Sequence, residues 1–144
     1  MSTHWNTEDA EEKGGRGASD LNAVTEKIIG AAMKVHTALG PGLLESAYEA
    51  CLAYELVNAG RVVERQKKLP LIYGDLQLEE GYRIDLLVDG RIVVELKAVE
   101  QLRDLHEAQL LSYLRLSGCS VGLLFNFNVR HLRTGIRRVI NTRN

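Results

Sequence analysis

The stretch that decides the fold is residues 82–97, YRIDLLVDGRIVVELK. Two runs of β-branched and aliphatic residues flank the turn-forming pair Asp89-Gly90, a pattern typical of two antiparallel strands joined by a tight turn. Three ionisable residues, Asp85, Glu95 and Lys97, lie inside these otherwise apolar strands. Because burying an unpaired charge costs several kcal/mol, each of the three requires a partner.

Two explanations for the three charges stay open at this point. One is a salt bridge. The other is a hard cation such as Mg²⁺, bound by the two carboxylates, with Lys97 close enough to position or deprotonate an attacking water. Side chains alternate along a strand, so Glu95 and Lys97 share a face.

The face of Asp85 depends on the turn. A two-residue turn at Asp89-Gly90 would put Asp85 opposite Val94, on the face away from Glu95. A three-residue loop over 88–90, with Gly90 left-handed, would put Asp85 opposite Val93 and on the face of Glu95. A metal site therefore predicts a three-residue loop or an equivalent bulge.

The rest of the sequence predicts two helices followed by strands and a third helix. Residues 1–18 have no apolar periodicity and are predicted to be a flexible arm, with 19–144 as a single domain. Ser19 or Asp20 should cap a first helix that stops at Gly40-Pro41, and a second helix should run from about residue 42 to Gly60. The remaining predicted elements are strands at 62–66, 69–73, 82–88 and 91–97 in an antiparallel meander, a helix at 102–116, and strands at 121–126 and 132–140. The predicted class is α/β, an α+β mixed sheet flanked by helices.

Composition and charge exclude several classes of protein. The chain has 144 residues, of which 45% are hydrophobic and 26% charged, which is typical of one globular domain. Cys51 and Cys119 belong to no disulfide or zinc pattern. No apolar run approaches the ~20 residues of a membrane span, and no secretion signal is recognisable, so we expect a cytoplasmic protein without a membrane partner.

Basic residues gather at two places although the net charge is −1. These clusters are either solvated faces or surfaces that contact nucleic-acid phosphates. Their members are Arg65, Lys67 and Lys68, then Arg130, Arg133 and Arg137.

Two short motif matches fail on context. Residues 118–122, GCSVG, match GxSxG but lie between a predicted helix and a strand, the reverse of a nucleophile elbow. Residues 106–110, HEAQL, lack the second histidine of a zinc HExxH helix. Neither motif supports a function here.

Three motifs carry a family resemblance. Asp85, a gap of about ten residues and Glu-x-Lys at 95–97 resemble the core of the PD-(D/E)xK nuclease superfamily, with Ile84 in place of the motif's proline. Residues 42–48, GLLESAY, resemble the signature of the GxxExxY family within that superfamily. Gln109 and Tyr113 resemble the QxxxY element of RecB-like nucleases. The resemblance covers about 21–140 and implies a restriction-endonuclease-like core.

The resemblance also implies roles for individual residues. Mg²⁺ or Mn²⁺ would be held by Glu45, Asp85, Glu95 and the backbone carbonyl of Leu96. Lys97 would be the catalytic lysine. Gln109 and Tyr113 would support the active site or contact the nucleic acid, and Tyr48 would orient Glu45 or cover the site.

The expected function is metal-dependent hydrolysis of phosphodiester bonds in nucleic acid, which we take to be DNA. One alternative is a catalytically weak or inactive nucleic-acid-binding or regulatory module of the same fold. Another is a protein-interaction domain in which Asp85 and Lys97 simply pair. The oligomeric state stays open, with a homodimer as one option.

Overall fold

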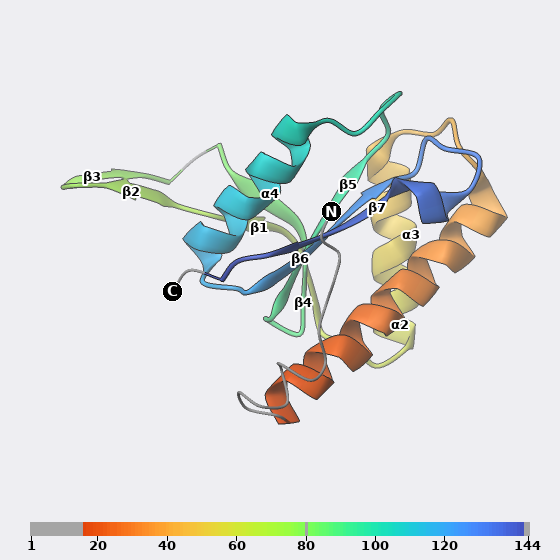
Figure 1. Cartoon of the computed structure of the whole chain (residues 1–144), viewed down its shortest axis with the longest axis horizontal. Helices are drawn as coiled ribbons and strands as arrows, with labels where there is room; N and C mark the ends of the chain where they lie inside the picture. Colours follow the sequence, from red (N-terminus) through yellow and green to blue (C-terminus); the bar gives the residue numbers. More distant parts are fainter. Residues whose placement is uncertain (1–15, 80, 143–144) are drawn as a thin grey trace.

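A five-stranded sheet in the order β1-β4-β5-β6-β7 forms the centre of the molecule. The computed structural model describes residues 16–79 and 81–142, so positions 1–15 of the predicted arm lie outside the described residues. Helices α2 and α3 cover one face of the sheet and α4 covers the other (Figure 1). The predicted class, a mixed sheet flanked by helices, is confirmed.

The first helix, α2 (Arg16–Leu39), begins earlier than expected. Neither Ser19 nor Asp20 caps it, and positions 16–18 of the predicted arm belong to it. Its buried residues recur every three or four positions, which is the spacing of one helix face: Val24, Ile28, Ala32 and Val35. The helix stops where Gly40 adopts a φ of +70°, a conformation that favours glycine.

The second helix, α3 (Glu45–Asn58), starts three residues later than predicted. Gly42 has a φ of +103°, so the chain is not helical before Leu44. At the other end the prediction for Gly60 is confirmed, with a φ of +86°. The N–H of Arg61 donates to the carbonyl of Leu56 at 2.9 Å, which closes the helix in the manner of a Schellman motif.

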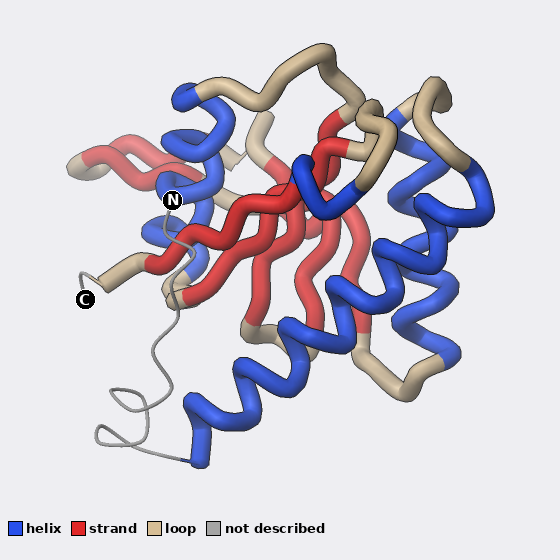
Figure 2. The backbone as a smooth tube through the Cα atoms, turned by 45° about the vertical axis from the view of Figure 1, so that its right-hand side comes forward, coloured by secondary structure: helices blue, strands red, loops and turns tan. Residues whose placement is uncertain are grey.

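The sheet consists of β1 (Val63–Lys68), β4 (Arg83–Val88), β5 (Ile92–Lys97), β6 (Val121–Asn126) and β7 (Ile136–Ile140). β5 and β6 run parallel, joined by α4 (Asp104–Ser117), and the other neighbouring strands run antiparallel. This arrangement buries β5 and β6 in the middle of the sheet (Figure 2).

Each face of the sheet packs on its own apolar core. Leu86, Val94 and Leu96 belong to the core that contains residues of α2 and α3. Leu87 and Val93 belong to the core that contains residues of α4. Since side chains alternate along β5, Glu95 and Lys97 lie on the same face as Val93, toward α4.

The β4–β5 loop has three residues, as a metal site requires, but they are 89–91 and not 88–90. Val88 pairs with Ile92 and Leu86 with Val94. Asp89 and Gly90 are both left-handed, with φ of +55° and +65°, and Arg91 is the additional residue of the loop. Continuing the register puts Asp85 opposite Glu95, and not opposite Val93 or Val94. The two carboxylates therefore share a face.

The predicted four-strand meander is wrong in one respect. β2 (Leu71–Tyr73) leaves the sheet and pairs with an additional strand, β3 (Leu76–Leu78), in a hairpin that projects from the body (Figure 1). Pro70 precedes β2 and lacks the N–H that a continuous ladder would need. β1 consequently pairs directly with β4.

The last predicted strand, 132–140, is divided in two. A 3₁₀ turn, η1 (Leu132–Gly135), comes first and β7 follows it. Gly135 accounts for the close packing at this turn, because a Cβ there would lie 2.5 Å from the backbone oxygen of Asn126. Within the described residues, none of the helices is long and apolar enough to span a membrane.

Candidate active site

At the end of the β4–β5 pairing, two carboxylates accept the hydrogen bonds that backbone carbonyls accept elsewhere in the sheet. The N–H of Asp85 donates to Glu95 Oε2 at 2.9 Å, and the N–H of Leu96 donates to Asp85 Oδ2 at 2.9 Å. The strands are thus joined by side chains at the point where regular pairing between them ends. This exchange holds both carboxyl groups at one place on the sheet.

Burial makes the site electrostatically unfavourable for two negative charges. Glu95 is only 4% exposed. Burial first, and then the charge of Asp85, raise the pKa of Glu95 to about 8. Burial also raises the pKa of Asp85, although the hydrogen bond from Leu96 opposes the change. At neutral pH the pair favours a bound proton or a cation.

Lys97 and helix α4 form the other side of the site. Lys97 Nζ donates to Gln109 Oε1 at 3.3 Å. Tyr113 lies one turn further along α4 and is largely buried. Its pKa is raised, first by burial and then by the charges of Glu95 and Asp85. Gln109 and Tyr113, four positions apart on α4, lie on one face of that helix, and Gln109 contacts Lys97.

Glu45 lies apart from this pair. It is the first residue of α3, it is exposed, and its Oε2 accepts the N–H of Ala98 at 2.9 Å. Among the described residues, no three His, Cys, Asp or Glu side chains form a group that could hold a metal ion. The structure therefore brings Asp85 and Glu95 together. Glu45 instead forms a hydrogen bond with Ala98, the residue that follows Lys97.

Tyr48 does not cover the site, contrary to one of the two expectations for it. It is fully buried in the core, stacked on Phe127 with 4.5 Å between ring centroids. Its hydroxyl donates to the carbonyl of Gly40 and accepts the N–H of Leu43. Tyr48 thus fixes the α2–α3 connection, and through it the start of α3.

Sequence reasoning missed two residues beside Asp85. Glu49, one helical turn after Glu45, is 7% exposed and pairs with Arg65 Nε at 3.1 Å. Gln66 Nε2 donates to Glu49 Oε1 at 2.7 Å and to Asp85 Oδ1 at 3.3 Å. Gln66 has a φ of +52°, which is rare for a residue with a side chain and shows that its position is imposed by the surrounding structure. The one signal in the sequence for this contact is that Glu49 comes directly after Tyr48 and three residues before Leu52, which places it beside the apolar face of the helix.

A third missed residue, Asn126, shapes the segment after β5. It is buried at the end of β6, where its Oδ1 accepts the N–H of Val99 at 3.0 Å and its Nδ2 donates to the Val99 carbonyl at 2.9 Å. The N–H of Phe127 donates to the Lys97 carbonyl at 2.8 Å. The chain from the Lys97 carbonyl to Val99 is consequently fixed.

The predicted basic residues differ in what they contact. Three of them are already paired with acidic side chains: Arg65 with Glu49, Lys67 with Glu64, and Arg137 with Glu107. Lys68 is exposed on the edge strand β1. Arg130 and Arg133 are exposed on the segment between β6 and β7, and within the described ranges neither forms an ion pair.

A mixed sheet that carries Asp85 and Glu95 side by side, with Lys97 two residues beyond, defines a restriction-endonuclease-like domain. Comparison with known families agrees with this class. The sequence profile of the PD-(D/E)XK nuclease superfamily matches residues 22–139, so the chain belongs to that superfamily. No curated protein and no solved structure matches the chain.

Proposed function

We propose that this domain is a metal-dependent nuclease that hydrolyses phosphodiester bonds, with DNA as its substrate. The observation that carries the proposal is the buried pair of Asp85 and Glu95, which accept backbone N–H groups from each other's strand. A purely structural role would not require two like charges in one buried place. Among the described residues Asp85 and Lys97 form no ion pair, which argues against a simple charge network.

The donor set suits Mg²⁺ or Mn²⁺. Mg²⁺ in enzymes of phosphate chemistry binds through one or two carboxylates together with water and substrate oxygens, so Asp85 and Glu95 suffice from the protein. The carbonyl of Leu96 points to the same side of β5 as its N–H, which contacts Asp85, and it could serve as a further ligand. When bound, the cation would neutralise developing negative charge and acidify a water molecule.

The other side chains would act on the substrate. Lys97, held by Gln109, would assist the attacking water or contact the scissile phosphate. Tyr113 has a raised pKa, so its hydroxyl keeps its proton and can donate a hydrogen bond to a phosphate oxygen. Gln66 would keep Asp85 in position from the opposite side.

The basic residues would bind phosphates without reading bases, which predicts weak sequence preference and strong salt dependence. Arg65, Lys67 and Arg137 would have to exchange their present acidic partners for phosphate. No such exchange is needed at Lys68, Arg130 or Arg133.

Within the superfamily we assign the chain to the GxxExxY family on the strength of residues 42–48. In that assignment Glu45 would join the site when the substrate binds. Its present contact with Ala98 keeps it at the end of β5, next to Lys97.

The test is calorimetric titration of Mg²⁺ and Mn²⁺ into wild type, Asp85→Asn and Glu95→Gln, followed by a cleavage assay on DNA and RNA with the same samples. We expect binding and cleavage by wild type and the loss of both in each variant. Glu79→Gln, which changes an exposed glutamate just after β3, is the matched control and should behave as wild type.

Two outcomes would overturn the proposal. Metal binding without cleavage, together with salt-dependent DNA binding, would favour a regulatory nucleic-acid-binding module. The absence of metal binding even with DNA present would remove the enzymatic proposal altogether.

A further inference from the structure

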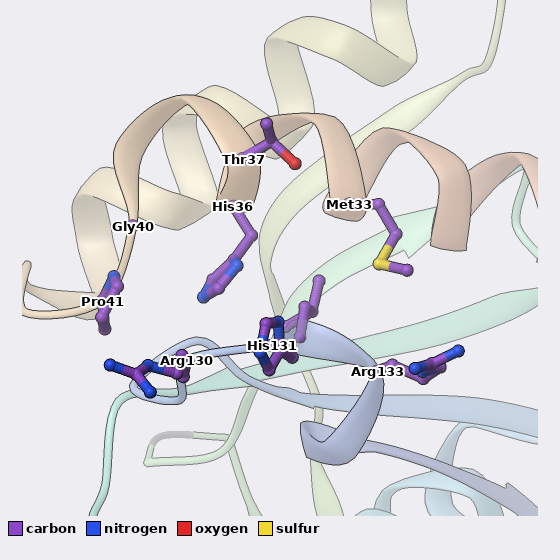
Figure 3. A pocket seen from close by; sticks show the side chains of 9 residues that line it. Met33, His36, Thr37, Gly40, Pro41, Arg130, His131 and Arg133 are labelled. Carbon is purple, nitrogen blue, oxygen red and sulfur yellow. The ribbon is translucent and has the colours of Figure 1, made fainter.

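A cavity of about 450 Å³ lies between the last turn of α2 and the segment that joins β6 to η1 (Figure 3). None of the proposed catalytic residues lines it. Its lining consists of Met33, His36, Thr37, Gly40, Pro41, Arg130, His131, Leu132 and Arg133. The volume falls within the range of small-molecule sites, about 300–1,000 Å³.

The lining is basic and contains no carboxylate. It includes two arginines and two histidines. In the described part of the chain neither Arg130 nor Arg133 has an acidic partner, in contrast to Arg65, Lys67 and Arg137. Two guanidinium groups without counter-charges favour an anion, and their planar fork of donors matches phosphate oxygens.

The cavity has ordered walls. His36 is buried on α2 and points toward the segment that carries Arg130 and His131 (Figure 3). Its Nε2 makes a hydrogen bond of 2.8 Å with the carbonyl of Val129, which joins the two walls. The next turn is closed by Thr134, whose N–H and hydroxyl both donate to the His131 carbonyl, at 3.0 and 2.9 Å.

Apolar groups supply the rest of the lining. Met33 and Pro41 are exposed and form apolar surface that a phosphate ion alone would leave uncovered. A nucleotide unit has both parts, an anionic phosphate and a sugar and base with apolar faces. Arg130 and Arg133 lie on either side of His131, near Pro41 and Met33 respectively (Figure 3), so the phosphate would bind to one of the two arginines and the sugar or base would cover the neighbouring apolar residue.

The cavity is also joined to the candidate active site through both of its walls. One wall continues from Pro41 to Glu45, whose carboxylate contacts Ala98. The other begins just after Phe127, whose N–H donates to the Lys97 carbonyl. Both walls of the cavity thus lead to residues that contact the end of β5, the strand that carries Glu95 and Lys97.

We propose that this cavity binds a phosphate group of a nucleic-acid strand, one or more nucleotides away from the bond at the active site. The preference for phosphate comes from the cavity itself. The choice of a nucleic-acid strand as the source of that phosphate rests on the proposed function.

The test is a set of titrations in EDTA, without metal, in which two-dimensional NMR is the readout of binding. The probes are inorganic phosphate, a mononucleotide and a single-stranded DNA hexanucleotide. The proteins are wild type, Arg130→Ala/Arg133→Ala, and the control Lys27→Ala/Arg115→Ala, which removes two positive charges from exposed residues elsewhere on the helices. Thermal melting of each variant verifies folding.

We expect all three probes to shift the amide signals of the cavity residues, and the hexanucleotide to bind at least about tenfold more tightly than phosphate. The arginine variant should weaken phosphate and hexanucleotide binding about tenfold or more, and the control less than threefold. Arg130→Lys/Arg133→Lys keeps the charge but not the fork, so its affinity should lie between those of wild type and the alanine variant.

Three results would overturn the proposal. Equal binding by wild type and the arginine variant would show that the cavity is not a phosphate site. Equal losses in the two alanine variants would show non-specific attraction to charge. A mononucleotide that binds as tightly as the hexanucleotide would show that the source is a free nucleotide. None of these titrations depends on metal or on cleavage. The phosphate site can therefore be confirmed or refuted independently of whether the protein is a nuclease.

Discussion

The metal-free protein should lose stability as the pH rises from about 4.5 to about 8, and Glu95→Gln should abolish that loss. Burial and the charge of Asp85 raise the pKa of Glu95 from 4.5 to about 8 in the folded chain. Below pH 4.5 the carboxyl group is protonated in both the folded and the unfolded state. As the pH rises toward 8, the unfolded state ionises first, so the free energy of unfolding falls, and it levels off above pH 8.

The magnitude follows from the pKa difference. Each pH unit between the two pKa values corresponds to about 1.4 kcal/mol, so ionisation of Glu95 costs the folded state about 5 kcal/mol in total. About 4 kcal/mol of this loss falls between pH 5 and pH 9. Glutamine is neutral and has nearly the same shape, and its oxygen can still accept the N–H of Asp85. The Glu95→Gln variant should therefore not show this pH-dependent loss of stability.

The assay is urea unfolding of wild type and Glu95→Gln in EDTA at pH 5, 7 and 9. The difference between the two proteins removes the contribution of other titrating groups. We expect the variant to gain several kcal/mol relative to wild type between pH 5 and pH 9, whereas Glu79→Gln should show no such gain. A constant difference across the three pH values would refute the electrostatic account of the site.

Four further predictions concern metal binding and packing. Mg²⁺ binding below pH 8 should release a proton, because Glu95 must ionise, and the heat measured by calorimetry should then depend on the ionisation enthalpy of the buffer; equal heats in PIPES and Tris buffers at the same pH would contradict this. Tyr48→Phe should cost about 1–3 kcal/mol in urea unfolding because two backbone groups lose their partner, whereas the same change at the exposed Tyr54 should cost little. Gly135→Ala should lower the melting temperature because its Cβ would meet a backbone oxygen at 2.5 Å. Gly30→Ala, with open space around it in α2, should raise the melting temperature or leave it unchanged.

The elements that sequence analysis predicted best are those with a strong local pattern. β6 has the predicted bounds because 121–126 is an almost continuous apolar run, as expected of a strand buried on both faces. The shared face of Asp85 and Glu95 was one of two alternatives, since a change of one residue in register moves every side chain to the other face. The structure decided between them through the bulged residue Arg91, which no local pattern distinguishes.

The parts that were missed depend on contacts between distant segments. Gln66 contacts Glu49 on α3 and Asp85 on β4, 17 and 19 residues away. Tyr48 was expected near Glu45 because the two are close in sequence, but its ring stacks on Phe127, the residue that follows β6. Such contacts depend on how helices dock on the sheet, which single-sequence periodicity does not specify.

The exchange of N–H donors between β4 and β5 gives the candidate site its own internal probe. The amide protons of Asp85 and Leu96 are held by carboxylates and not by backbone carbonyls. Their rates of exchange with solvent deuterium should therefore change whenever Glu95 or Asp85 gains a proton or a cation, while the amides of Val93 and Leu87, deeper in the ladder, should change little. The amides of Asp85 and Leu96, on neighbouring strands, would thus report whether the site holds a proton or a cation, without any added label.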